Sequence, residues 1–289
     1  MTTDVVVQSE SNSKRATPAW YRNARRVALS PEGLTLILLI IIAILAPLLA
    51  PHNPTQSNPA AALLPPSAKH WFGTDSFGFD VFSRVLYATR IDLIIALGGV
   101  AIGIVIGVAL GALAGYAGGY ADGILMRLVE MFQSFPQLLF AMIIFAAIGN
   151  STVNLVGIIA LLNAVFYVRL VRSMALTLRD VEYVLAAKVA GLPTRAIVVR
   201  HVVPRVLGPV FGQFAVSAAF AIQLVAGLGF LGLGVRLPEP EWGSMIQIGA
   251  GYIIDGQWWP AVFPGLAIVV TTWALMGVGR RLRRIAEGR

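Results

Sequence analysis

Few residues of this sequence have the types and spacing that support metal binding or catalysis. His52, His70 and His201 are isolated in sequence, and the chain contains no cysteine. Zinc sites usually take histidines or cysteines from short, fixed spacings such as H-E-x-x-H, which does not occur here. The G-x-S-x-G elbow of serine hydrolases is also absent. We therefore expect no metal site, and no hydrolase motif is present.

One glycine pattern has the spelling of a dinucleotide-binding motif. Gly227–Gly232 reads G-x-G-x-x-G. That motif requires a strand before it, a helix after it and an acidic residue about 20 positions later. Here the pattern ends a long apolar run and continues into Gly234 and Pro238. We interpret these glycines as the place where the chain leaves a helix and folds back.

A P-loop for ATP requires Gly-Lys-Ser/Thr, because glycine amides and a lysine hold the phosphates. The lysines of this chain follow serine or alanine: Lys14, Lys69 and Lys188. The sequence therefore has no P-loop. If the protein depends on ATP, another subunit must bind the nucleotide and its magnesium ion, and no cofactor is expected on this chain.

The composition explains why the sequence contains so few motifs for catalysis or metal binding. Of the 289 residues, 57% are hydrophobic and only 12% are charged, whereas soluble domains carry about 25% charged residues. The mean hydropathy is +0.77. A soluble fold of this size could not bury so much apolar surface. The composition therefore predicts an all-α membrane protein that crosses the bilayer several times.

Six apolar stretches are long enough to cross a bilayer, which takes about 20 residues as a helix. They are Leu34–Ala50, Leu93–Tyr116, Met131–Ile148, Val153–Leu170, Val206–Gly234 and Ala261–Gly279. The regions that follow from these spans are a tail (1–33), a first transmembrane helix (34–50), an outer loop with an amphipathic helix near its end (51–92), a five-helix domain (93–279) and a basic tail (280–289). The five-helix domain contains a polar inner loop, residues 179–205, between the fourth and fifth spans of the chain.

The positions of the basic residues predict that both termini are cytoplasmic. With that orientation, most of the 22 Lys and Arg residues lie inside: in the two tails, near Arg127 and between the fourth and fifth spans. Only Lys69, Arg84, Arg90 and Arg236 lie outside. This is the expected bias of membrane proteins. The net charge of +8 therefore reflects topology and attraction to anionic lipids, not binding to nucleic acid.

A stripe of glycines marks the second span. Gly103, Gly107, Gly111 and Gly115 repeat at a spacing of four, so they lie on one slowly winding face of a helix. Small residues let the backbones of membrane helices approach closely. We predict a tight contact between two helices along this face.

The segment between the fourth and fifth spans has the features of a docking helix. Glu182 suits the positive end of a helix dipole, and Ala186 and Ala187 keep one face small. Gly191 and Pro193 then end the helix. A short helix with a smooth face, placed in the cytosol between two spans, is typical of an element that docks against another subunit.

This segment resembles the EAA loop of permease subunits of binding-protein-dependent ABC importers. That loop reads E-A-A, three residues, G, nine residues and then I-x-L-P. Glu182–Ala187, Gly191 and Pro204 match the form E-Y-V-x-A-A found in peptide-type permeases. Two positions depart from the general pattern, because Leu185 replaces its Glu and His201 replaces its Ile.

Further blocks narrow the resemblance. His70–Asp75, Asp80–Arg84, Phe230–Arg236 and Glu241–Gly243 are similar to segments of the C-type permease subunit of dipeptide and oligopeptide importers. The similarity extends over about residues 30–280. Val278 departs from it, because many relatives have an acidic residue there.

The resemblance implies a type I importer (MetI-like) permease fold in the bacterial inner membrane. It implies a heterodimer with a homologous second permease, two cytoplasmic ATPase subunits, an extracytoplasmic substrate-binding protein and a peptide substrate. ATP and magnesium would be bound by the ATPases. The residues implied in coupling to the ATPases are Glu182, Ala186, Ala187, Gly191, Pro193, Arg195, Arg200 and Pro204.

Several alternatives stay open at this point. The same architecture serves importers of nickel or glutathione. An intramembrane enzyme or a secondary carrier is disfavoured, because the spans show no paired acids and no midplane charge. Four polar residues either line the transport path or form hydrogen bonds between helices: Asn154, Asn163, Gln213 and Gln223.

Overall fold

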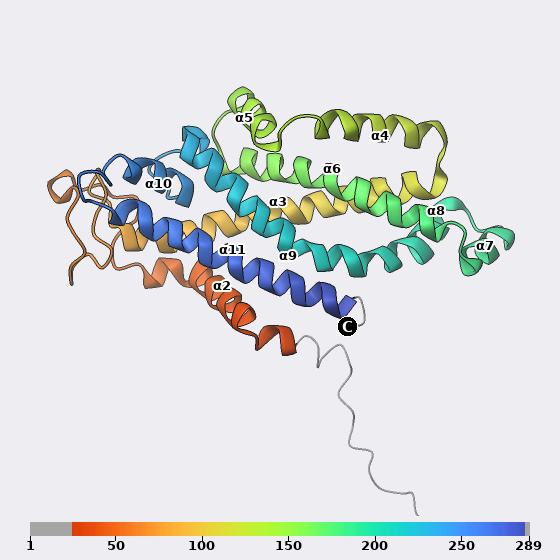
Figure 1. Cartoon of the computed structure of the whole chain (residues 1–289), viewed down its shortest axis with the longest axis horizontal. Coiled ribbons are helices and arrows are strands. Elements are labelled where there is room, and N and C mark those ends of the chain that lie inside the picture. The colour runs from red at the N-terminus through yellow and green to blue at the C-terminus, as the bar shows by residue number, and fades with distance from the viewer. Residues whose placement is uncertain (1–24, 287–289) are drawn as a thin grey trace, which may run out of the picture.

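The computed structural model describes residues 25–286, and this part of the chain is a bundle of helices (Figure 1). Within these residues the extended structure is limited to an isolated bridge between Thr74 and Asp80. The helices are α2 (Pro31–Leu49), α3 (Val81–Ala117), α4 (Gly119–Gln133), α5 (Gln137–Ile148), α6 (Thr152–Leu178), α7 (Glu182–Val189), α8 (Thr194–Ile197), α9 (Val203–Leu228), α10 (Trp242–Ala250) and α11 (Trp259–Ala286).

Five of these helical segments are long and apolar enough to cross a membrane: Pro31–Leu49, Val81–Ala117, Thr152–Leu178, Thr194–Leu233 and Trp259–Ile285. The broken pair formed by α4 and α5 supplies a sixth if it is counted as one span. The expected all-α membrane fold is thus confirmed. The boundaries of two spans differ from the sequence-based prediction. In each case the difference can be explained by individual residues that break or cap a helix.

The predicted third span, Met131–Ile148, is wrong as a single helix. The chain breaks between Gln133 and Gln137, and α4 and α5 meet at an angle of 92°. Pro136 causes the break, because proline lacks an amide hydrogen and disfavours helical backbone at the residue before it. Hydropathy did not reveal the break, since apolar residues continue on both sides of it.

The predicted boundary between an amphipathic outer helix and a second span is also wrong. Both belong to α3, which runs for 37 residues from Val81. The carboxylate of Asp80 caps its N-terminus by accepting from the amide of Ser83 at 2.8 Å, and no proline interrupts the helix. At 1.5 Å per residue α3 is about 55 Å long, much longer than the bilayer core of about 30 Å.

The chain leaves the fifth span where glycines cluster, as predicted. A π-type turn over Gly229–Leu233 follows α9, and Gly232 takes φ = +81°, which favours glycine. A Cβ at Gly229 would collide with the carboxylate of Glu241. The backbone therefore folds back and places α10 against α9 and α11, with Trp242 fully buried.

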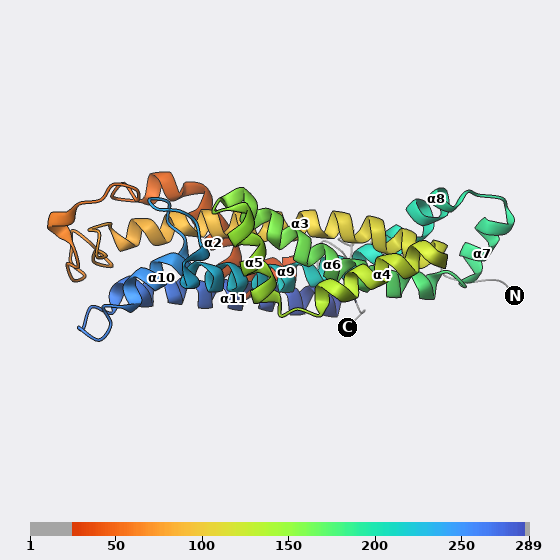
Figure 2. The same cartoon turned by 90° about the horizontal axis from the view of Figure 1, so that it is seen from above.

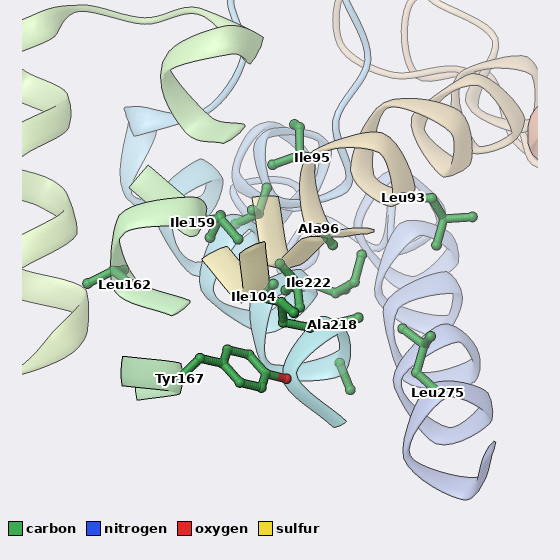
Figure 3. Close-up of a cluster of buried hydrophobic side chains, with 14 of the residues drawn as sticks. Leu93, Ile95, Ala96, Ile104, Ile159, Leu162, Tyr167, Ala218, Ile222 and Leu275 are labelled. Carbon is green, nitrogen blue, oxygen red and sulfur yellow. The ribbon is translucent and has the colours of Figure 1, made fainter. Parts of the chain in front are cut away.

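The two ends of the bundle are built differently. The hairpin of α7 and α8 projects from one end, whereas the loop 51–80 and α10 lie at the other (Figures 1 and 2). Between these ends α3, α6, α9 and α11 run side by side and share a core (Figure 3). That core contains Leu93, Ile95, Ala96 and Ile104 from α3, Ile159, Leu162 and Tyr167 from α6, Ala218 and Ile222 from α9, and Leu275 from α11.

The glycine stripe of α3 lies against α6. A Cβ added to Gly103 would lie 2.6 Å from Cβ of Asn163, and one added to Gly107 would overlap Cβ of Tyr167. Such contacts are shorter than van der Waals packing allows. The two helices can therefore approach this closely only because α3 has no side chains here.

The same close contact continues toward the end that carries α7. A Cβ at Gly111 would lie 2.6 Å from the backbone oxygen of Val168, and one at Gly115 would lie 2.6 Å from that of Arg172. Because these neighbours are backbone atoms, a rotamer change could not relieve the overlap. We call this contact, formed by Gly99, Gly103, Gly107, Gly111 and Gly115 of α3 against α6, the glycine seam.

Replacing Gly107 with alanine tests the seam. The added methyl group would force α3 and α6 apart, and overpacking of this kind costs about 1–3 kcal/mol. We expect Gly107→Ala to lower the thermal unfolding midpoint of the purified chain in detergent.

Gly98→Ala is the matched control on the same helix, because a Cβ at Gly98 has nothing within 4 Å. Alanine is a better helix former than glycine by about 1 kcal/mol, so this variant should be unchanged or slightly more stable. Equal destabilisation by both substitutions would contradict a specific contact at Gly107.

Candidate functional site

The α7–α8 hairpin is held to the bundle by a few buried side chains. Val184 of α7 and Ile197 of α8 are each only 1% exposed. Gly191 forms the turn between the two helices with φ = +79°, and its amide donates to the backbone oxygen of Lys188 at 3.0 Å. The hairpin is thus anchored by its inner face, and its outer face is free to meet another molecule.

Aromatic contacts fix the base of the hairpin to the start of α9. The ring of Tyr183 lies 5.3 Å from the guanidinium carbon of Arg205, a cation–π distance. The same ring lies 6.3 Å from the imidazole of His201. Any force applied to α7 would therefore be passed to α9 as well as to α6, which leads directly into α7.

The outer face of α7 is apolar and exposed. Leu185 is 43% exposed and Val189 is 89% exposed, and both lie on the same helical face as Glu182 and Ala186. Exposure of these two apolar side chains to water is unfavourable, and neighbouring exposed apolar residues often mark a surface that binds another molecule. We call Glu182, Leu185, Ala186 and Val189 the α7 face. Sequence analysis missed its two larger members, although their spacing of four was the available signal.

The structure places nearly all residues predicted for coupling at the surface of this end. Ala187 is the exception, since it is half-buried and packs against the core. The others are exposed: Glu182, Ala186, Gly191, Pro193, Arg195, Arg200 and Pro204. A Cβ at Gly191 would have nothing within 4 Å. The positive φ of Gly191 accounts for glycine at that position, whereas the exposed side chains of the other residues are available to contact another molecule.

A cavity of about 240 Å³ lies between α5, α6 and α9. Its lining combines apolar side chains with a few amides and a hydroxyl: Gln137, Ile159, Leu162, Asn163, Phe166, Gln213, Ser217, Phe220, Ala221 and Leu224. Phe166 and Phe220 are 40% and 57% exposed. The cavity therefore opens at the surface of this chain, and α6 and α9 on either side of it belong to segments apolar enough to cross a membrane.

Two of the four residues predicted for the transport path line this cavity. Asn163 and Gln213 do, whereas Asn154 and Gln223 do not. The amide of Asn154 donates to the backbone oxygens of Ile148 and Gly149 at 3.0 and 2.8 Å and thus closes the turn between α5 and α6. Gln223 is exposed on α9, outside the cavity. Helix periodicity could have distinguished the two cavity residues from the other two, but only if the faces by which α6 and α9 pack had been known.

Hydrogen bonds hold the polar lining in place. Asn163 donates to the backbone oxygen of Ile159 at 2.8 Å, and Tyr167 and Ser217 are 3.0 Å apart across α6 and α9. The side-chain oxygen of Gln213 accepts from Arg283 of α11 at 2.6 Å.

An ion pair ties α4 to α6. The guanidinium of Arg172 binds both carboxylate oxygens of Asp122, at 2.5 and 2.6 Å.

A buried arginine organises the opposite end of the bundle. Arg84 is fully buried and donates to the backbone oxygens of Pro54 at 2.8 Å and Pro238 at 3.0 Å. Its nearest carboxylate, that of Asp75, lies 4.0 Å away. Burial raises the pKa of Asp75, and the charge of Arg84 opposes that shift. Arg84 thereby joins three separate segments: the loop after α2, the start of α3 and the loop before α10.

The loop 51–80 also brings together two histidines that are far apart in sequence. His52 and His70 stack with ring centres 4.8 Å apart, and both approach Asp80. The sequence analysis expected no metal site, because it treated these histidines as isolated. Their meeting depends on how the loop folds back on the start of α3.

Comparison with known proteins gives consistent matches over most of the chain. Residues 103–289 match the family described as "Binding-protein-dependent transport system inner membrane component". Residues 33–66 match the "N-terminal TM domain of oligopeptide transport permease C".

Individual relatives agree with these family matches. The probable D,D-dipeptide transport system permease protein DdpC of Escherichia coli is 39% identical, over 86% of this chain and 84% of its own length. The dipeptide transport system permease protein DppC of the same organism is 41% identical, over 85% of this chain and 84% of its own. The protein of that name from Alkalihalophilus pseudofirmus is 37% identical, over 91% and 86%.

The helical bundle, its membrane-spanning segments and these matches lead to the same conclusion. The chain belongs to the family of inner membrane components of binding-protein-dependent transport systems, and it is a multi-pass permease subunit of a bacterial ABC transporter.

Proposed function

We propose that this permease moves dipeptides and short oligopeptides into the cell, with energy from separate ATPase subunits that act on the α7 face. The observation that carries the coupling role is the exposed apolar pair Leu185 and Val189 at the tip of an anchored hairpin. The relatives named above are permeases of dipeptide transport systems, and this supports the choice of substrate. Nickel and glutathione are the alternative cargoes.

The α7 face suits a groove on an ATPase. Burial of Leu185 and Val189 in a partner would stabilise the complex by about 25 cal/mol per Å² of apolar surface removed from water. The exposed Arg195 and Arg200 lie on the same projecting end. Closure of two ATPase subunits would push α7, and its anchors at Val184 and Tyr183 would carry the movement into α6 and α9 as a rigid-body rotation.

The cavity suits one half of a transport path. Asn163 and Gln213 would face lipid if this chain were alone, and exposure of polar groups to hydrocarbon is unfavourable. A second, homologous permease placed against α5, α6 and α9 would cover the opening and supply the other half of the lining. Amides and a hydroxyl among apolar side chains suit the backbone of a peptide, whose groups are uncharged donors and acceptors.

The proposed orientation places both termini and the α7 face in the cytoplasm. The basic last turn of α11, with Arg283 and Arg284, then lies inside, as the distribution of positive charge requires. The loop 51–80 and α10 would face the binding protein outside. The chain itself would carry neither catalytic residues nor a cofactor, because ATP hydrolysis would occur on the ATPases.

The substrate class can be tested with the complete transporter in proteoliposomes. We expect ATP-dependent uptake of labelled dipeptides that depends on the binding protein and is competed by unlabelled dipeptides. Uptake of Ni²⁺ or glutathione without dipeptide uptake would instead identify one of the alternative cargoes.

Val189→Glu tests the coupling surface. Val189 is 89% exposed, so the substitution should leave the fold and the unfolding midpoint of this subunit unchanged. A charge in an apolar groove is costly to desolvate, so we expect peptide uptake and co-purification of the ATPase subunits to fall at least tenfold.

Lys188→Gln is the matched control on the same helix. Lys188 is also exposed, but helical geometry places it about 100° around the axis from Val189, outside the α7 face. Its uptake should stay near the unmodified level. Normal uptake by Val189→Glu would remove the basis of the coupling proposal.

Asn163→Leu tests the cavity. Leucine has about the size of asparagine but lacks the amide that would form a hydrogen bond with the peptide. Loss of one such bond, worth about 1 kcal/mol, corresponds to a rise of about fivefold in the KM for peptide uptake. ATPase co-purification should not change.

Gln223→Leu is its control, because this amide lies on α9 outside the cavity. A similar rise in KM for both variants would show that the effect does not come from the cavity.

A further inference from the structure

At the end of the bundle opposite α7, three side chains converge that the transport function does not use. The Nδ1 atoms of His52 and His70 lie 3.6 and 2.9 Å from the same oxygen, Oδ1 of Asp80. Ligand atoms of all three residues lie within 4.8 Å of one another. The three residues come from the segment after α2, the middle of the loop 51–80 and the cap of α3.

The carboxylate of Asp80 is oriented so that one oxygen remains available. Its Oδ2 atom accepts from the amide and the hydroxyl of Ser83 at 2.8 and 2.7 Å, as the cap of α3. Oδ1 points to the histidines instead. A carboxylate whose second oxygen is held by hydrogen bonds is a preorganised ligand, because those bonds fix its direction.

The histidines are held in place as well. The backbone amide of His52 donates to the hydroxyl of Ser83 at 3.1 Å, and that of His70 donates to the hydroxyl of Ser67 at 3.2 Å. His70 is buried, whereas the side chain of His52 is 35% exposed. The cluster is therefore rigid on one side and can be reached by a small ion on the other.

A simple hydrogen-bonded cluster does not account for His52. One proton between His70 and Asp80 satisfies that pair at 2.9 Å. The Nδ1 atom of His52 is shielded from solvent and has no hydrogen-bond partner within the described residues. Shielded imidazole nitrogens normally have a partner. This atom points toward the shared oxygen, where a bound cation would satisfy it.

The distances from the two imidazoles to Asp80 are close to those between the ligands of a metal ion. Zinc binds histidine nitrogen at about 2.0–2.1 Å and carboxylate oxygen at about 2.0–2.2 Å, so tetrahedral ligand atoms lie about 3.3–3.5 Å apart. The separations of the two Nδ1 atoms from Oδ1 of Asp80, 2.9 and 3.6 Å, lie on either side of that range. All three ligand atoms lie within 4.8 Å of one another, so small movements of the side chains would bring them around one ion.

The ligand types select the class of ion. Two imidazoles and one carboxylate suit zinc and its neighbours among the divalent transition metals, whereas magnesium and calcium prefer oxygen ligands. A cavity of about 380 Å³ beside the cluster leaves room for a water molecule as the fourth ligand. Lys69 also lines this cavity and would oppose a cation, but it is exposed, so water screens its charge.

We propose that His52, His70 and Asp80 form a binding site for one divalent transition-metal ion, with Zn²⁺ as its best fit. The ion would join the segment after α2, the loop 51–80 and the start of α3. It would thereby stabilise the surface that, in the proposed orientation, faces the binding protein.

The test uses the purified full-length chain in detergent, with an affinity tag that contains no histidine. The protein is incubated with ZnCl2 and desalted, and bound zinc is measured by elemental analysis. Co²⁺ serves as a spectroscopic probe, because a tetrahedral site with nitrogen and oxygen ligands gives intense visible absorption. We expect one zinc ion per chain and an unfolding midpoint that rises with zinc concentration.

His52→Ala is the decisive variant, because the side chain of His52 makes no hydrogen bond within the described residues and its removal should not disturb the fold. Loss of a direct ligand should weaken zinc binding by more than the roughly 10–100-fold that loss of an outer-shell partner costs. His70→Ala should have the same effect if the variant folds. His201→Ala is the matched control, because it removes the third histidine of the chain and leaves the cluster intact.

Each outcome has a clear meaning. One zinc ion on the unmodified chain and on His201→Ala, with none on His52→Ala, would establish the site. The proposal is overturned if the unmodified chain binds no more zinc than His52→Ala does. It is equally overturned if Mg²⁺ or Ca²⁺ displaces zinc at similar concentrations, because the nitrogen ligands would then play no part.

Discussion

The close contact between α3 and α6 is the constraint on which the rest of this structure depends. Along the glycine seam the backbones approach so closely that a single methyl group has no room. In a membrane, packing of this kind replaces the hydrophobic effect as the force between helices, because lipid tails are as apolar as leucine. The seam fixes α6, and α6 in turn places one wall of the cavity and leads directly into the α7 hairpin.

The seam also explains how a movement at one end could reach the other. A rigid pair of helices transmits a push without absorbing it in side-chain rearrangements, because there are few side chains between the two backbones to rearrange. The hairpin is joined to this pair through the chain that leads from α6 into α7 and through the contact of α8 with α3, and Tyr183 joins it to Arg205 of α9. The break at Pro136 between α4 and α5, in contrast, is a place where the backbone departs from a straight span.

The opposite end depends on buried polar side chains. Arg84 is enclosed and binds two backbone oxygens from segments about 30 and 154 residues away, and Asp80 both caps α3 and contacts two histidines. Buried charges are costly unless they are paired and hydrogen-bonded. Here the hydrogen bonds of Arg84 and Asp80 tie the loop 51–80, the start of α3 and the loop before α10 together.

Some of this could be predicted from sequence because it depends on local physics. Composition and apolar runs determined the membrane class and most spans, the spacing of Gly103 to Gly115 indicated a packed face, and Gly191 and Pro193 marked the end of a short helix. Hydropathy did not locate the exact break in the third span, because Gln133, Ser134 and Gln137 interrupt the apolar residues only briefly around Pro136. The continuity of α3 from Val81 was missed because a polar stretch and an apolar one can belong to a single helix.

The amino-acid sequence alone was enough to predict a bundle of membrane helices, a short docking helix between two spans and the lack of a P-loop. Three features required the folded structure: which polar residues line the same cavity, the exposure of Leu185 and Val189 on α7, and the proximity of His52 and His70 to Asp80. Periodicity and hydropathy describe residues that are close together in the sequence. Contacts between distant segments depend instead on how whole helices and loops pack against one another.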